Sequence, residues 1–156
     1  MAKKLDQILV VDLEATCWEE EPPSGQDREI IEIGFCLLDV ATGQRLDNPS
    51  ILVKPQNSTV SEYCTALTTL TQEEVDRGDS FPEACRILRE EYDSEKRLWA
   101  SYGDYDRKQF QQQCAASGID YPFGEGHINV KSLFAVAHGL ANEVRLDRAM
   151  AMMGWE

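Results

Sequence analysis

The sequence Gln7–Trp18, QILVVDLEATCW, joins an apolar run to two acidic residues. The run from Ile8 to Val11 is typical of a buried strand and leads directly into Asp12 and Glu14. Because side chains alternate between the faces of a strand, both carboxylates point the same way, roughly 6 to 7 Å apart. Burying them is costly unless a cation neutralises them. The stretch is therefore either a site for a hard cation, Mg²⁺ or Mn²⁺, or a strand that ends in a solvated turn.

The overall composition is that of a single globular domain. The chain has 156 residues, of which 42% are hydrophobic, and no apolar run approaches membrane-spanning length. The N-terminal sequence lacks the apolar core of a signal peptide. Its five cysteines are scattered and form no CxxC pair, which is typical of reduced thiols. We therefore expect a cytoplasmic protein without a membrane partner.

The charge balance is strongly acidic. Asp and Glu total 28 against 15 Lys and Arg, which gives a formal charge of −13. The chain thus lacks the basic footprint of a protein that grips a long nucleic acid. Either the partner is not a nucleic acid, or only a short end is held and metal ions supply the positive charge. The best local candidates for phosphate contacts are Lys96–Arg97 and Arg107–Lys108, and the alternative for both is ordinary solvated surface.

Hydrophobic periodicity and turn residues predict strands first, followed by strands that alternate with helices. The predicted strands after the first one are residues 28–40, 45–54, 96–101 and 128–130. The predicted helices are residues 60–67, 71–77, 80–94, 104–117, 131–139 and 146–153. This order predicts an α/β fold with a mixed central sheet, an antiparallel meander plus parallel strands, flanked by helices.

Several segments together resemble a known family. DLEATCW followed by EIIEIGFCLL resembles the first motif of the DEDDh 3′–5′ exonucleases of the DnaQ/RNase T-like superfamily, which have the RNase H-like fold. SEYCTALTTLTQEEVDRGDSFPE and ASYGDYDRKQF resemble the Eri-type and KapD-like branch. The resemblance runs from about Gln7 to the last residue, so we expect residues 1–156 to form one exonuclease-like domain. It implies hydrolysis with two divalent cations, Mg²⁺ or Mn²⁺, roughly 4 Å apart.

The resemblance also assigns the acidic residues as catalytic metal ligands. It makes Asp12 the ligand that bridges both metals and Glu14 a ligand of the first. The second motif, an aromatic residue followed by Asp near a helix start, makes Asp106 a ligand of the second metal. The alternative for Asp106 is a first-turn acid favoured by the helix dipole. Asp104 is the competing acid in this motif, and its position is typical of a helix N-cap.

The third motif of the family has no match in this sequence. In the family a histidine that acts as the general base stands five residues before the last metal-binding aspartate. Here His127 is followed five residues later by Ser132, and His138 by Glu143. Both histidines are therefore interpreted as structural or exposed. We expect a C-terminally incomplete domain with weak or no activity, because one ligand and the base are missing.

Three further residues are implied to lie at the substrate. In the family the backbone after the first motif, here Ala15 and Thr16, faces the terminal nucleotide, and the leucine at Leu70 contacts a base. The alternative for Leu70 is a plain core residue. The family often has glycine at the position of Thr69, so this loop departs from the family pattern.

The leading hypothesis is a metal-dependent 3′–5′ exonuclease that releases nucleoside 5′-monophosphates. Its expected partner is a single-stranded RNA or DNA 3′ end, because a long duplex grip requires many phosphate contacts. RNA is favoured by the branch resemblance. The alternative is a non-catalytic regulatory or binding module with an exonuclease-like fold, because fold alone does not determine function. A third possibility is an acidic protein with an incidental Mg²⁺ site.

Overall fold

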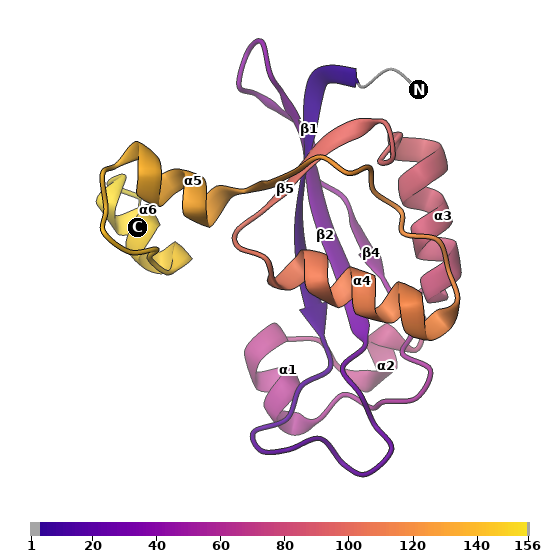
Figure 1. Cartoon of the computed structure of the whole chain (residues 1–156). Coiled ribbons are helices and arrows are strands. Elements are labelled where there is room, and N and C mark those ends of the chain that lie inside the picture. Colours follow the sequence, from indigo (N-terminus) through magenta and orange to yellow (C-terminus); the bar gives the residue numbers. More distant parts are fainter. Residues whose placement is uncertain (1–3, 156) are drawn as a thin grey trace.

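The computed structural model describes residues 4–155 and contains a mixed six-stranded sheet in the order β3-β2-β1-β5-β6, with β4 also paired to β2. Helices α3 and α4 cover one face of the sheet, while α5 and α6 project to one side (Figure 1). The strands are β1 (Lys4–Ala15), β2 (Ile30–Asp39), β3 (Arg45–Asp47), β4 (Ser50–Leu52), β5 (Arg97–Ser101) and β6 (His127–Asn129). The helices are α1 (Glu62–Thr68), α2 (Gln72–Val75), α3 (Phe81–Tyr92), α4 (Tyr105–Ser117), α5 (Val130–Ala137) and α6 (Leu146–Met152).

Strand β1 is central and has different neighbours on its two edges. It runs antiparallel to β2, with Glu14 opposite Glu32. It runs parallel to β5, and the last residue pair on that side is Val10 with Ala100. Beyond Val10, the edge of β1 that faces β5 is therefore free to hydrogen-bond with another element.

The core lies between the sheet and helices α3 and α4. On β1, Leu9, Val11 and Leu13 alternate with more exposed residues and are buried, as the period of a strand predicts. They belong to one cluster with Trp99 of β5 and Phe110 of α4. Burying a side chain of this size contributes about 1.5 to 3 kcal/mol. This core fixes the face of β1 on which Asp12 and Glu14 emerge.

The predicted mixed α/β architecture is confirmed. One prediction is wrong, because a segment predicted as a single strand is interrupted. The segment predicted as a strand over residues 45–54 forms two short strands, β3 and β4, separated by Asn48 and Pro49. Proline has no N–H to donate to a strand ladder, so it interrupts the pairing with β2. Within residues 4–155, no helix is long and apolar enough to cross a membrane.

The loop between α1 and α2 contains an unusual backbone conformation. Thr69 ends α1 with φ 66°, in the left-handed region, and its N–H donates to the carbonyl of Thr65 at 2.8 Å. A β-branched residue is disfavoured there, because its Cβ crowds the backbone. The loop therefore keeps a turn that glycine adopts without strain.

Replacing Thr69 with glycine is expected to raise the free energy of unfolding by about 1 kcal/mol, because the left-handed conformation no longer strains a side chain. For a chain of this length the melting temperature would rise by about 2 to 4 °C in a thermal unfolding experiment. Thr68→Gly is the matched control and should be destabilising. The Thr68 hydroxyl donates to the Cys64 carbonyl at 2.9 Å and accepts from the Leu70 N–H at 3.2 Å. Equal melting temperatures for Thr69→Gly and the unaltered chain would contradict the strain.

Candidate active site

Three carboxylates share one face of the sheet. Asp12 and Glu14 are two residues apart on β1, so their side chains lie on the same face. Glu32 of β2 lies directly opposite Glu14. Side chains of directly opposed residues point to the same face and have Cβ atoms about 4.5 to 5.5 Å apart. Asp12 is paired with Gly34, which has no side chain, so β2 places no side chain directly opposite Asp12. The sheet register thus gathers acidic groups at the end of β1.

A fourth carboxylate reaches this group from helix α4. Asp106 is the second residue of α4 and is only 5% exposed. Its Oδ1 accepts a hydrogen bond from the backbone N–H of Leu13 at 3.0 Å. That N–H belongs to the edge of β1 that β5 leaves unpaired. Asp106 is therefore held at the level of the strand between Asp12 and Glu14.

Burial raises the pKa values of these acids, and the nearby negative charges raise them further. Burial and the nearby charge of Glu32 raise the pKa of Asp12. Burial, followed by the charges of Asp12, Glu32 and Asp106, raises the pKa of Glu14. The pKa of Asp106 rises to about 6, mainly by burial and with a smaller effect of Asp12, although the Leu13 N–H opposes the rise. In the part of the chain that the structure describes, no lysine or arginine contributes to these shifts.

The chemistry of this donor set fits a hard divalent cation. All four groups offer oxygen atoms, which suit Mg²⁺ and Mn²⁺, and their mutual repulsion is relieved by positive charge. Among residues 4–155, however, no group of three or more Asp, Glu, His or Cys side chains is arranged to hold a metal ion as it stands. The metal-ligand assignment of these residues therefore stays a prediction.

The structure separates the two competing acids at the start of α4. Asp104 occupies the N-cap position, as expected, but its side chain makes no capping hydrogen bond. Its Oδ1 lies 3.1 Å from the Arg107 guanidinium and 3.8 Å from Nδ1 of His127. Asp106 instead contacts β1. Of the two acids, Asp106 is thus the one that joins the carboxylate group of β1.

Neither histidine is free to serve this site. The His127 side chain is buried, its Nε2 lies 2.8 Å from the Ser101 hydroxyl, and its ring packs 4.3 Å from that of Trp99. Burial and the nearby Arg107 lower the pKa of His127, while Asp104 partly offsets this change. His138 follows the end of α5 and packs against Phe134 with ring centroids 4.2 Å apart. Both histidines thus have structural contacts.

The residues predicted to face the substrate are partly occupied by internal hydrogen bonds. Thr16 is fully buried, its N–H donates to the Glu29 carbonyl at 2.8 Å, and its hydroxyl lies 3.0 Å from that of Ser58. The carbonyl of Ala15 accepts a weak hydrogen bond from the Cys64 thiol. Leu70 is half-buried against a small cluster that contains Cys64. A nucleotide contact in this segment therefore cannot use the Thr16 amide or hydroxyl.

Glu32 is the residue of this group that the sequence analysis did not single out. Its signal was present, because Glu32 is an isolated acid in the apolar run IIEIGF. An acid at such a position either faces solvent or serves a site. Only the pairing of Glu14 with Glu32 shows that the two lie on the same face.

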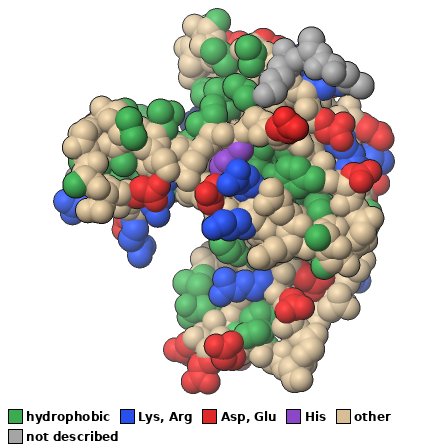
Figure 2. Space-filling model, viewed as in Figure 1, with side chains coloured by type: hydrophobic (Ala, Val, Ile, Leu, Met, Phe, Trp, Pro, Cys, Tyr) green, Lys and Arg blue, Asp and Glu red, His purple; other side chains and the backbone are tan. Residues whose placement is uncertain are grey.

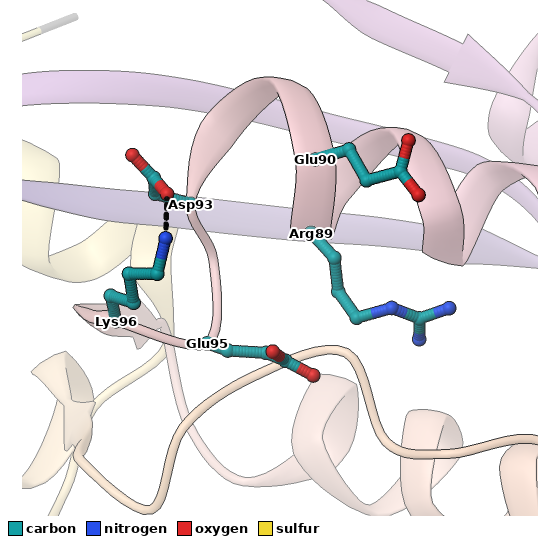
Figure 3. Close-up of a pocket in the computed structure, with 5 residues that line it drawn as sticks. All are labelled: Arg89, Glu90, Asp93, Glu95 and Lys96. Carbon is teal, nitrogen blue, oxygen red and sulfur yellow. Dashed lines mark hydrogen bonds and ion pairs between the residues drawn. The ribbon is translucent and has the colours of Figure 1, made fainter. Parts of the chain in front are cut away.

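A hollow at the C-terminal end of α3 is not part of this site. Its lining consists of Arg89, Glu90, Asp93, Glu95 and Lys96, and Lys96 Nζ lies 2.7 Å from Asp93 (Figure 3). Asp93 also pairs with Lys4 at the beginning of β1. Because a strand rises about 3.3 Å per residue, that end of β1 is about 26 Å from Asp12.

Comparison with known proteins supports a nuclease. The family model described as "Exonuclease" matches residues 9–155. The chain is 36% identical over 139 residues to 3′-5′ exoribonuclease 1 of Rattus norvegicus, and 35% identical over 141 residues to the Homo sapiens protein of that name. Each match covers 83% of this chain. The matches span 40% and 39% of those relatives, so this chain corresponds to less than half of their length.

Solved structures show the same fold. The nuclease domain of 3′hExo, described as a DEDDh family member bound to rAMP, has a TM-score of 0.83 and 28% identity, covering 100% of this chain and 82% of that one. A 3′-exonuclease solved for recognition of a histone mRNA stem-loop has a TM-score of 0.77 and 30% identity, covering 89% and 51%. These matches confirm the family resemblance of the sequence. The chain belongs to the exonuclease family, that of the DEDDh 3′–5′ exonucleases of the DnaQ and RNase T superfamily, and has the RNase H-like fold.

Proposed function

We propose that this domain hydrolyses single-stranded RNA from its 3′ end with the help of Mg²⁺ or Mn²⁺ and releases nucleoside 5′-monophosphates. The observation that carries the proposal is the group of Asp12, Glu14 and Asp106, which strand β1 and the hydrogen bond from the Leu13 N–H to the Asp106 carboxylate bring together. The relatives named 3′-5′ exoribonuclease and the neighbour bound to rAMP support RNA as the substrate. The net charge of −13 favours a short single-stranded end over a long duplex.

In this proposal Asp12 and Glu14 hold the cations from β1, and Asp106 holds them from α4. Bound cations supply positive charge for the attacking and leaving oxygens of the scissile phosphodiester. The Leu13 N–H orients the Asp106 carboxylate and keeps it beside the strand. The terminal nucleotide lies against Leu70 and the segment around Ala15 and Thr16. Glu32 raises the negative charge of the site and so strengthens its preference for divalent cations.

Hydrolysis by this chain is expected to be slow. Water attack benefits from a general base, which typically contributes about 10²- to 10⁴-fold in rate. His127 is already bonded to Ser101, and His138 packs on Phe134 away from the sheet. This same observation favours the second candidate function, a binding or regulatory module that holds an RNA end without cleaving it.

Asp106→Asn is expected to lower the rate of 3′-end cleavage more than about 100-fold, since a direct metal ligand contributes at least as much as its supporting contacts. The substrate is 5′-labelled single-stranded RNA with a free or a blocked 3′ end, incubated with Mn²⁺ or Mg²⁺. The neutral side chain should also abolish the rise in melting temperature that Mn²⁺ causes.

The matched control is Asp104→Asn, which removes the same charge two residues away. This variant should keep both the cleavage ladder and the stabilisation by Mn²⁺. Equal losses in the two variants would contradict the assignment of Asp106. If Mn²⁺ stabilises the unaltered chain and RNA binds without any cleavage, the binding module replaces the exonuclease.

Stability without metal is expected to depend on pH through Asp106. Its pKa of about 6 in the folded chain exceeds its ordinary value of 3.8, so the folded state binds the proton more tightly. As pH falls from 7 towards 4, this group should stabilise the fold by up to about 3 kcal/mol. The stabilisation is complete below the unfolded pKa and is lost as pH rises through 6.

Melting curves in EDTA across this pH range, for the unaltered chain and Asp106→Asn, measure this contribution. The asparagine variant should be the more stable of the two at pH 7, and its advantage should disappear at acidic pH. In the presence of Mn²⁺, stabilisation of the unaltered chain should fall as pH drops through about 6, because protons compete with the metal. Parallel pH profiles in EDTA would contradict a raised pKa at Asp106.

A further inference from the structure

A cavity of about 650 Å³ lies beside the candidate active site. It is formed by one side of α4, the loop of residues 16–29 and the loop that follows β4. Tyr105 lines it and immediately precedes Asp106, so the cavity begins one residue from a proposed metal ligand. The proposed metal site uses none of the other residues that line this cavity.

Two cationic side chains in this cavity are not neutralised. An acidic protein binds the phosphates of a ligand through Lys or Arg side chains that do not already form ion pairs with carboxylates. Most of the basic residues that the sequence analysis considered for phosphate contacts form ion pairs, namely Lys96–Asp93, Arg97–Asp6 and Arg107–Asp104. Within residues 4–155, neither Arg28 nor Lys108 forms an ion pair, and both line the cavity. Figure 2 shows basic side chains gathered on the face that carries α4.

The carboxylates of the cavity leave this positive charge largely available. Glu29 is occupied, because its carboxylate accepts hydrogen bonds from the backbone N–H groups of Gln56, Asn57 and Ser58 at 2.9, 2.8 and 2.7 Å. These bonds hold the loop after β4 in place and compensate the charge of Glu29. Asp27 is the remaining acid among the lining residues, and it is exposed to solvent.

The other lining groups suit a nucleic-acid strand. The side-chain amides of Asn57 and Gln112 line the cavity and form no hydrogen bonds in the described chain, and such amides commonly contact phosphate and sugar oxygens. The Tyr105 ring is 47% exposed and offers a surface on which a base can stack. The cavity thus combines cations, free amides and an aromatic ring, the groups with which proteins bind single-stranded nucleic acids.

We infer that this cavity binds the RNA strand upstream of its 3′ end, with Arg28 and Lys108 in contact with backbone phosphates. The inference rests on the proposed function, because it assumes that the terminal nucleotide lies at Asp12, Glu14 and Asp106. It identifies two cations through which a protein of charge −13 can hold an RNA end.

Fluorescence anisotropy tests this inference without relying on cleavage. The probe is a short 5′-fluorescein-labelled RNA whose 3′-terminal linkages are phosphorothioates that resist hydrolysis, titrated with the whole chain at several salt concentrations. For single strands each phosphate contact contributes about 0.7 to the slope of log K against log salt. The double variant Arg28→Ala/Lys108→Ala should therefore lower the slope by about 1.4 and weaken binding roughly tenfold at low salt.

The matched control is Arg45→Ala/Arg148→Ala, which removes two exposed cations that lie outside the cavity and form no ion pair with any residue the structure describes. It should keep the slope and affinity of the unaltered chain, and Asp27→Asn should bind RNA more tightly. Equal slopes for the two double variants would overturn the cavity assignment while leaving the exonuclease proposal intact. If the unaltered chain does not bind the RNA at all, the inference and the proposed RNA substrate both fail.

Discussion

The hydrogen bond from the Leu13 N–H to the Asp106 carboxylate is the constraint on which the site depends. It exists because β1 extends past the last residue that β5 pairs with, so one strand edge offers an unpaired donor. A buried N–H of this kind is costly to leave without a partner. The first turn of α4 supplies that partner, and the same bond joins the Asp106 carboxylate to the acidic end of β1. One backbone requirement of the sheet thereby assembles the site.

The packing of β1 holds carboxylates close together, and their proximity is electrostatically unfavourable. Leu9, Val11 and Leu13 anchor one face of β1 in the core, and this burial leaves Asp12 and Glu14 no freedom to turn inward. The fold therefore holds several carboxylates together even though burial, and then their mutual repulsion, raises their pKa values. Such a cluster is typical of a functional site, where stability is lowered locally so that charge can be offered to a ligand.

Ion pairs on the rest of the surface determine which basic side chains remain available to a ligand. Ion pairs such as Arg107–Asp104 and Lys96–Asp93 neutralise most basic residues that are adjacent in sequence. Exposed pairs of this kind contribute little stability, so their main effect here is on which cations remain available to a ligand. Two of the cations that form no ion pair within residues 4–155, Arg28 and Lys108, line the cavity beside the acidic site. A strongly acidic protein can thus contact RNA over a restricted surface.

The sequence alone determined the order of strands and helices, the pairing of Asp12 with Glu14 on one face, and the family, because these depend on local periodicity and on motifs within short segments. It did not show the break of the strand at Pro49 clearly, or that Glu32 joins the acids. Nor did it decide from the residues themselves between Asp104 and Asp106, or show that Arg107 is neutralised while Lys108 is not. Those outcomes depend on strand register and on which side of a helix meets the sheet. Only the tertiary structure settles them, because they arise from contacts between residues far apart in the chain.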